Sequence, residues 1–260
     1  MRLTVVQAGT AAQGRGPGGS CFLLTLDVGR AARHVIVDLG PGSLDRLAAA
    51  RVDLRDVAAI FLTHLHPDHA AELASAIQTM IYGLKEPRTD PLVIVGGPGI
   101  KGFVESLARW QGAWIVGKPD RFEIRIDEMS PGDREKVSLG GTELPFSVGR
   151  VAHSDSSVAF RFHVGQDLVL TGDTGPCESL VEFAQGAGCL VTECSFPDTS
   201  PISGHMTPSA LSDLAMRSKV SRLILGHFYP AMDPAAALDQ VGRAFPGTVL
   251  PALPGLEIMI

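Results

Sequence analysis

The sequence predicts an α/β protein in which two β-sheets are packed between layers of helices. Short apolar runs rich in β-branched residues are separated by turn residues, and this pattern indicates buried strands. Single helical stretches alternate with the strand-rich stretches in both halves of the chain, as expected when helices cover two sheets. No low-complexity linker interrupts the 260 residues, so we expect a single domain over residues 1–260.

The apolar runs place the predicted strands at residues 2–7, 21–27, 33–38, 57–62, 92–96, 122–127, 144–150, 157–163, 167–172, 188–193, 222–226 and 255–259. The predicted helices span residues 43–50, 69–83, 99–110, 177–186, 208–217 and 234–244. The last two begin with an N-cap residue followed by proline, Thr207-Pro208 and Asp233-Pro234. The Gly/Pro-rich segment 14–19 lacks the Lys-Ser/Thr of a phosphate-binding loop, so we expect an exposed loop there.

Composition and charge limit the classes of function. Hydrophobic residues make up 45% of the chain and charged residues 19%, which indicates a compact folded protein rather than a disordered one. The formal net charge of -6 argues against a broad nucleic-acid-binding surface, because neutralising backbone phosphates requires basic residues.

The chain carries no sign of export or of a membrane partner. The first ten residues predict a strand and a turn rather than a signal peptide, and no apolar run approaches the ~20 residues of a membrane-spanning helix. Four cysteines without Cys-x-x-Cys spacing are expected to be reduced thiols in or near the core: Cys21, Cys177, Cys189 and Cys194. We therefore expect a cytoplasmic protein.

The most informative segment follows the predicted strand 57–62. Within six residues it contains His64, His66, Asp68 and His69. Imidazole and carboxylate groups are the ligands that suit zinc and related divalent ions. Burying four such groups together is costly unless a metal ion pairs with them. The alternative interpretation is a solvated polar loop that happens to be rich in histidine. We favour a metal site.

The positions of other polar residues support this interpretation. Three more histidines follow a predicted strand or precede a predicted helix: His153, His205 and His227. Asp173 follows the apolar run 168–170, and its two carboxylate oxygens could bridge two cations. On its own, the sequence Gly-Asp-Thr at 172–174 would indicate only a turn. The remaining histidines, His34 and His163, are expected to be ordinary strand or surface residues.

The order and spacing of these residues resemble the metal-binding motifs of the metallo-β-lactamase superfamily. The pattern His-x-His-x-Asp-His at 64–69 is followed in order by His153, Asp173 and His227, and an Asp-x-Gly begins at Asp38. The resemblance covers nearly the whole chain and implies an αββα sandwich with the site at one edge of the two sheets.

The resemblance also implies the cofactors and their ligands. Two divalent metal ions are expected, zinc first, with manganese or iron as alternatives. Metal one would be held by His64, His66 and His153, metal two by Asp68, His69 and His227, and Asp173 would bridge them.

The second half is most similar to the ribonuclease Z-like phosphodiesterase branch. Four segments carry this similarity: Ala-Phe-Arg at 159–161, LVTECSF at 190–196, GHMT at 204–207 and LILGHFYP at 223–230. In that branch a Glu and a His form a pair that assists chemistry on a phosphodiester, and the matching residues here are Glu193 and His205. We assign catalytic roles to these two and to Asp68, which could orient the attacking water and take its proton.

Two departures argue against RNA as the substrate. The enzymes of this branch that process transfer RNA carry a long basic arm, and no such insertion lies between His153 and His227. Glu72 also stands where those enzymes usually have Gly. We therefore expect a small-molecule ester substrate, first of all a small or cyclic phosphodiester, and keep transfer RNA 3′-processing as an alternative.

Other reactions of the same fold remain open. They are hydrolysis of a sulfate ester, a lactone or a thioester and, less favoured, β-lactam hydrolysis or oxidation by a single iron. A non-catalytic ligand-binding module is a further alternative, which the intact Asp68 and His205 argue against. By family habit the chain is expected to form a homodimer.

Overall fold

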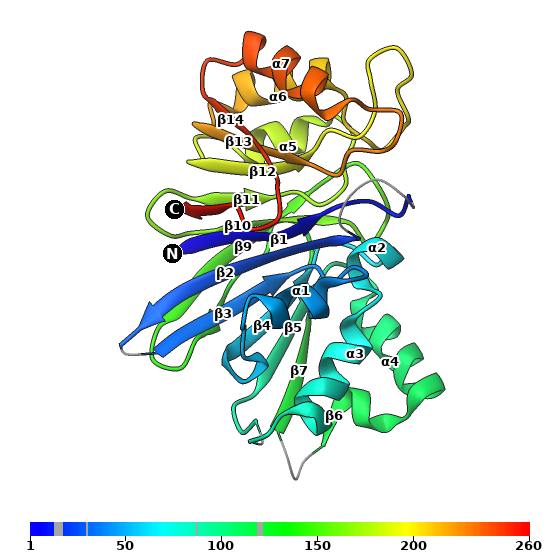
Figure 1. Cartoon of the computed structure of the whole chain (residues 1–260), viewed down its shortest axis with the longest axis vertical. Coiled ribbons are helices and arrows are strands. Elements are labelled where there is room, and N and C mark those ends of the chain that lie inside the picture. Colours follow the sequence, from blue (N-terminus) through cyan, green and yellow to red (C-terminus); the bar gives the residue numbers. More distant parts are fainter. Residues whose placement is uncertain (13–17, 30, 87, 119–121) are drawn as a thin grey trace.

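A computed structural model describes residues 1–12, 18–29, 31–86, 88–118 and 122–260. Two β-sheets lie face to face, and helices cover the outer face of each, which gives four layers (Figure 1). The predicted αββα sandwich is confirmed. Residues 14–17 of the predicted loop lie outside the described residues.

Within the described residues, the first sheet has eight strands in the order β15-β1-β2-β3-β4-β5-β7-β6. Their bounds are β1 Arg2–Ala8, β2 Ser20–Val28, β3 Ala31–Val37, β4 Val57–Leu62, β5 Leu92–Gly96, β6 Gly117–Lys118, β7 Phe122–Glu128 and β15 Glu257–Met259. The strands β3, β4, β5 and β7 run parallel to one another. The outer face is covered by α1 Ser43–Ala49, α2 Pro67–Ala70, α3 Leu73–Gln78 and α4 Ile100–Gln111, with short turns of helix at η1 Leu54–Asp56 and η3 Ala113–Val116.

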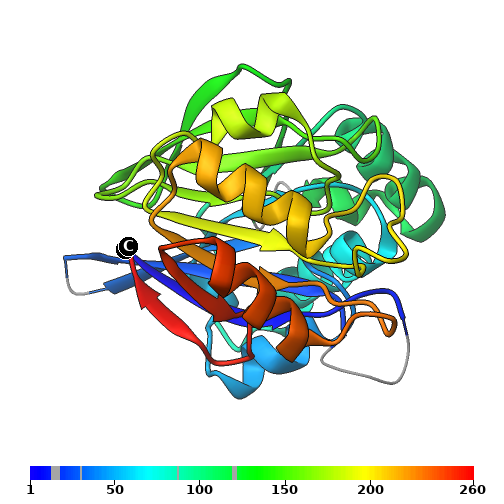
Figure 2. The ribbon, with the colours of Figure 1, turned by 90° about the horizontal axis from the view of Figure 1, so that it is seen from above.

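The second sheet has seven strands in the order β14-β13-β12-β11-β10-β9-β8. Their bounds are β8 Arg134–Ser138, β9 Glu143–Arg150, β10 Val158–Phe162, β11 Leu168–Leu170, β12 Cys189–Glu193, β13 Arg222–Gly226 and β14 Thr248–Pro251. The strands β11 to β14 are parallel. Figure 2 shows helices lying across the outer face of this sheet, and these are α5 Glu178–Phe183, α6 Pro208–Ser218 and α7 Pro234–Ala244.

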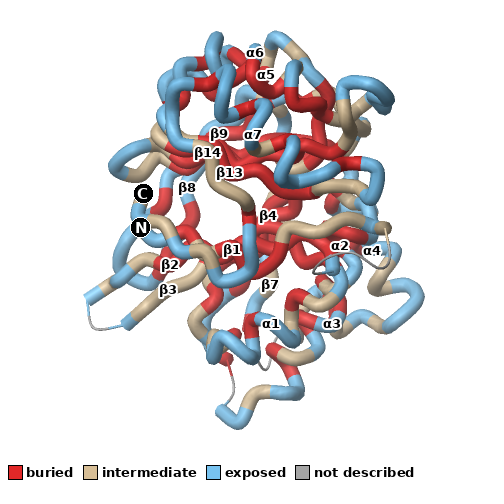
Figure 3. The backbone as a smooth tube through the Cα atoms, turned by 45° about the horizontal axis from the view of Figure 1, so that its top comes forward, coloured by how far each residue is buried: buried red, intermediate tan, exposed pale blue. Residues whose placement is uncertain are grey.

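Apolar side chains form three buried layers because the strands present alternate residues to opposite faces. In β3, Val35 and Val37 point into the layer between the sheets, whereas Ile36 points toward α1 and α3. The inter-sheet layer includes Phe61, which packs edge to face on Phe146 at a centroid distance of 4.9 Å. Figure 3 shows this buried interior running through the middle of the molecule.

The structure corrects the predicted helix over 69–83. It begins at Pro67 and is divided into α2, α3 and a π-helical turn, η2 Thr79–Gly83. The division occurs because the carbonyl of His69 accepts a hydrogen bond from the amide of Leu39, and the amide of Glu72 donates to the carbonyl of Leu39. These bonds to the chain after β3 replace intrahelical ones.

Other predictions hold in part. The caps are confirmed, since the Thr207 hydroxyl accepts from the amide of Ala210 and Asp233 accepts from that of Ala235. The cysteines are free, and three of the four are buried. Three strands were missed, β6, β8 and β14, and each lies at the edge of a sheet. Among the described residues, none of the helices combines the length and apolarity needed to cross a bilayer.

Candidate metal centre

The predicted site residues gather where strands of both sheets end. His64, His66, Asp68 and His69 follow β4 and begin α2. Three others come from the second sheet: His153 follows β9, Asp173 follows β11 and His227 follows β13. Because β11, β12 and β13 are parallel, their carboxyl ends lie side by side at this edge.

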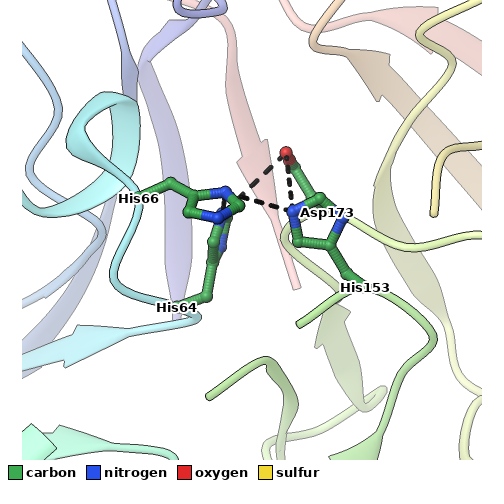
Figure 4. Close-up of side chains that lie close together, drawn as sticks. All are labelled: His64, His66, His153 and Asp173. Carbon is green, nitrogen blue, oxygen red and sulfur yellow. Dashed lines mark hydrogen bonds and ion pairs between the residues drawn. The ribbon is translucent and has the colours of Figure 1, made fainter. Parts of the chain in front are cut away.

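The first group of potential ligands consists of His64, His66, His153 and Asp173, whose ligand atoms lie within 4.8 Å of one another (Figure 4). His66 Nδ1 is 3.1 Å from His64 Nε2 and 3.2 Å from His153 Nε2. Asp173 Oδ2 is 3.9 Å and 3.8 Å from those two Nε2 atoms. Ligands about 2.0–2.1 Å from a tetrahedral zinc ion are about 3.3–3.4 Å apart, so this spacing suits a shared cation.

The second group consists of Asp68, His69, His227 and the same Asp173. Asp173 Oδ1 is 3.2 Å from His69 Nε2 and 3.3 Å from His227 Nε2. His227 Nε2 is also 3.3 Å from Asp68 Oδ2. One oxygen of Asp173 therefore faces each group.

The hydrogen bonding of Asp173 tests whether these residues fit metal ions. Its Oδ1 is buried and has no hydrogen-bond partner among the described residues. A buried carboxylate oxygen without a donor is costly unless a cation neutralises it. Asp173 is thus suited to bridging two cations, and the donor set fits a dinuclear site.

Contacts behind the ligands fix which ring nitrogen faces the site. His69 Nδ1 donates to Asp38 Oδ2 at 2.7 Å. His64 Nδ1 lies 3.2 Å from Thr63 Oγ1, which in turn donates to Asp38. When Nδ1–H donates to such a partner, the lone pair of Nε2 stays free to bind a metal ion. Hydrogen-bond partners behind the ligands also raise the affinity of a site for its metal.

The histidines from the second sheet are held in the same way. His153 Nδ1 donates to the carbonyl oxygen of Gly204 at 3.0 Å. His227 Nδ1 lies 3.1 Å from Ser195 Oγ, whose hydroxyl donates to the carbonyl of His227 at 2.8 Å. Four of the five candidate ligand histidines therefore present Nε2 inward.

Burial and neighbouring charges shift the pKa values of these groups. Burial, and then the adjacent His69, lowers the pKa of His64. Burial alone would raise the pKa of Asp173, but the surrounding histidines, His227 first, lower it. Burial would lower the pKa of His69, but Asp38 and Asp173 raise it well above its usual value. Asp173 therefore stays ionised, and His64 stays neutral.

Close backbone packing at strand ends supports this arrangement. Asp38 and His227 adopt the left-handed conformation, with φ of 63° and 58°, which is unusual outside glycine and is typical of functional sites. Gly172, at φ +59°, leaves no room for a side chain, because a Cβ there would lie 2.4 Å from Thr63 Oγ1.

Glu193 and His205 form a pair beside the two groups. His205 Nδ1 is 3.0 Å and 3.1 Å from the two oxygens of Glu193, which also accept from the amides of Thr174 and Met206. Burial would lower the pKa of His205, but the hydrogen bond and charge of Glu193 raise it. The His205 ring lies 5.0 Å from that of His153. Glu193, His205 and His227 are themselves close enough to form a third potential metal group.

Sequence reasoning missed the supporting residues Thr63, Ser195, Gly204 and Gly172. Their roles depend on contacts between distant segments, and the only local signal is that Thr63 and Gly172 adjoin predicted ligands. His34 and His163 lie outside all three groups; His34 contacts Thr25, and His163 contacts Ser147 and Asp167.

A comparison with known families decides the classification. The family described as a beta-lactamase superfamily domain matches residues 33–228. The chain belongs to the metallo-β-lactamase superfamily. As a member of this superfamily with a His/Asp metal-binding cluster, it is a metal-dependent hydrolase.

This metallo-β-lactamase superfamily member resembles ribonuclease Z proteins in sequence. It is 31% identical to ribonuclease Z of Mycolicibacterium gilvum over 224 residues, which covers 78% of this chain and 77% of the relative. Among solved structures, the fold is similar to the metallo-beta-lactamase fold protein YhfI from Bacillus subtilis, with a TM-score of 0.82, 18% identity and coverage of 99% and 98%. It is also similar to the short form of human tRNase Z, with a TM-score of 0.73, 21% identity and coverage of 100% and 99%.

Proposed function

We propose that this hydrolase is a dinuclear phosphodiesterase that acts on a small or cyclic phosphodiester and uses two zinc ions, with manganese or iron as alternative metals. The observation that carries the proposal is the Glu193–His205 pair, 3.0 Å between Oε1 and Nδ1, at the rim of the two metal-binding groups. A charged imidazole in this position is suited to a reaction in which negative charge develops on phosphate oxygens.

The seven ligands are proposed in the roles that the sequence suggested. His64, His66 and His153 would hold one ion, Asp68, His69 and His227 would hold the other, and Asp173 would be shared between them. When bound, two such ions neutralise the phosphate and lower the pKa of a water molecule.

The residues of the chain then supply positioning and a proton. Asp68 stays ionised, because its hydrogen bond with His227 and the nearby His69 lower its pKa against the effect of burial. Its carboxylate accepts a hydrogen bond from the attacking water and orients it. His205, protonated with the help of Glu193, donates from Nε2 to the phosphate or to the leaving oxygen.

The length of the connections supports a small substrate. β10 and β11 are separated by only a few residues, and α5 follows β11 closely, so the described chain between β10 and α5 has no extended arm. The net charge of -6 also disfavours a long RNA, whose binding depends on basic contacts.

A second candidate function is transfer RNA 3′-processing. It is favoured by the 31% identity to a ribonuclease Z, an enzyme name that denotes cleavage of RNA phosphodiesters. Sulfate-ester, lactone or thioester hydrolysis would use the same metal groups, and a single bound iron would instead indicate oxidation chemistry.

The test is a substrate panel after metal quantification. Zinc-loaded and manganese-loaded protein is assayed on bis-p-nitrophenyl phosphate, cyclic nucleotides, an aryl sulfate, a lactone, a thioester and precursor transfer RNA. We expect the highest kcat/KM on a small phosphodiester. A higher value on the sulfate, lactone or thioester, with no phosphodiester turnover, refutes the proposal. Size-exclusion chromatography with light scattering checks the expected homodimer.

A further inference from the structure

Two aromatic side chains beside the candidate metal centre have no part in the chemistry above. Phe196 and Tyr229 stack with their ring centroids 4.8 Å apart and their planes at 21°. Phe196 follows β12 and Tyr229 follows β13. Because these strands are parallel neighbours, both rings lie at the edge that carries the metal ligands.

The pair lies directly against the site. The Tyr229 ring is 5.4 Å from that of His227 and 5.7 Å from that of His205, and the Phe196 ring is 5.4 Å from His205. The amide of Tyr229 donates to the carbonyl of Ser195 at 3.2 Å, which fixes one segment against the other. Ser195, which orients His227, therefore also holds the stack in place.

Filling the core does not explain this pair. Among the described residues, neither ring belongs to the three buried apolar layers, and both remain partly exposed, whereas Phe61 and Phe146 are almost fully buried.

We propose that the Phe196–Tyr229 stack binds an aromatic ring carried by the substrate, either a nucleobase or an aryl ester group, while the phosphate lies at the metal groups. The inference rests on the proposed phosphodiesterase function. A phosphate next to His205 and His227 puts its ester substituent within reach of a stack that a third ring can extend. Stacking on aromatic side chains tolerates different bases, since each has a π-face.

Binding of simple phosphate monoesters tests the stack without relying on turnover. Methyl phosphate, phenyl phosphate and thymidine 5′-phosphate are titrated into zinc-loaded protein by calorimetry. We expect the two aromatic compounds to bind roughly 5- to 150-fold more tightly than methyl phosphate. If phenyl phosphate and thymidine 5′-phosphate gain the same affinity over methyl phosphate, the stack recognises an aromatic ring of either kind. If the nucleotide gains more, the stack prefers a nucleobase. Either result supports the proposal.

Three variants identify the residues responsible. Tyr229→Leu and Phe196→Leu should remove most of the aromatic advantage and leave the Kd of methyl phosphate unchanged, which also shows that the site is intact. Tyr229→Phe should retain the advantage, because it loses only the hydroxyl. Trp110→Leu is the control, since this exposed tryptophan lies on α4 beside the other sheet.

The outcomes separate this inference from the proposed function. If methyl phosphate binds as tightly as phenyl phosphate, or if the aromatic advantage survives both leucine substitutions, the stack does not bind substrate. If no phosphate compound binds and phosphodiesters are not hydrolysed, the proposed function fails as well. A variant that unfolds is replaced by Tyr229→Met or Phe196→Met, which lack the ring but have a flexible side chain that adapts to the space left behind.

Discussion

Asp38 Oδ2 accepts a hydrogen bond from His69 Nδ1 at 2.7 Å, and both side chains are buried. Asp38 also accepts from the amide and the hydroxyl of Thr63. A single carboxylate at the end of β3 thus orients one ligand directly and His64 through Thr63.

Asp38→Asn should weaken metal binding while retaining the fold. The amide side chain has nearly the same shape but fewer acceptor sites, so it cannot satisfy the Thr63 donors and His69 together. Loss of such an outer partner typically costs about 10- to 100-fold in metal affinity. Competition with a chromophoric chelator measures this change. Asp56→Asn, which changes a partly exposed carboxylate paired with Arg33, is the matched control and should leave metal affinity unchanged.

Purified protein should contain close to two metal ions per chain. Since metal binds the folded state, chelation should lower the Tm by about 10 °C, and adding metal back should restore it. Elemental analysis and calorimetry check these values. A fully loaded protein with one ion contradicts the dinuclear assignment, and one with three ions would bring in the group of Glu193, His205 and His227.

Gly172→Ala should lower the free energy of unfolding more than Gly186→Ala does. Both Gly172 and Gly186 adopt positive φ, but only at Gly172 would a Cβ meet another residue, Thr63. Gly186→Ala should cost only the left-handed conformation, ~1–2 kcal/mol. Gly172→Ala should add ~1–3 kcal/mol from overpacking and should also lower metal content. Urea unfolding with metal analysis compares the two, and equal effects would refute the role of Gly172.

His205→Ala should keep both metal ions and lose about 10²–10³ in kcat on phosphodiesters, as expected when an oriented donor is removed. Glu193 raises the pKa of His205, and the charged form is the active one, so activity should fall as pH rises through that pKa. Glu193→Gln lowers this pKa and should shift the alkaline limb of the kcat profile to lower pH.

The double variant of Glu193 and His205 should be little worse than His205→Ala alone, because Glu193 acts through His205. Loss of a metal ion from His205→Ala would instead make His205 a ligand. Full activity in that variant would favour lactone or thioester hydrolysis.

Precursor transfer RNA should be a poorer substrate than small phosphodiesters, because an acidic chain without a basic arm makes few contacts to backbone phosphates. Comparing kcat/KM at increasing salt concentration measures this. Efficient cleavage on the 3′ side that weakens steeply with salt would favour the ribonuclease function.

The sequence predicted the layers and the places where the candidate metal ligands gather, because both follow from local patterns. Apolar runs mark buried strands such as β4, and polar residues after them mark the sheet edge. The sequence pattern did not predict the edge strands β6, β8 and β14, because they bury few side chains. In β8, for example, Val137 is the one buried residue. The orientation of His153 by Gly204 and the stacking of Phe196 on Tyr229 depend on contacts between distant segments, which a single sequence does not reveal.

The candidate metal ligands come from both sheets, with four after β4 and three from the second sheet. Neither half of the chain alone provides a complete set, so tight binding must await the docking of one half on the other. Metal should therefore leave the refolding rate nearly unchanged and slow the unfolding rate instead. Bound ions would then set how long each molecule survives heat or protease, which is a kinetic form of stability.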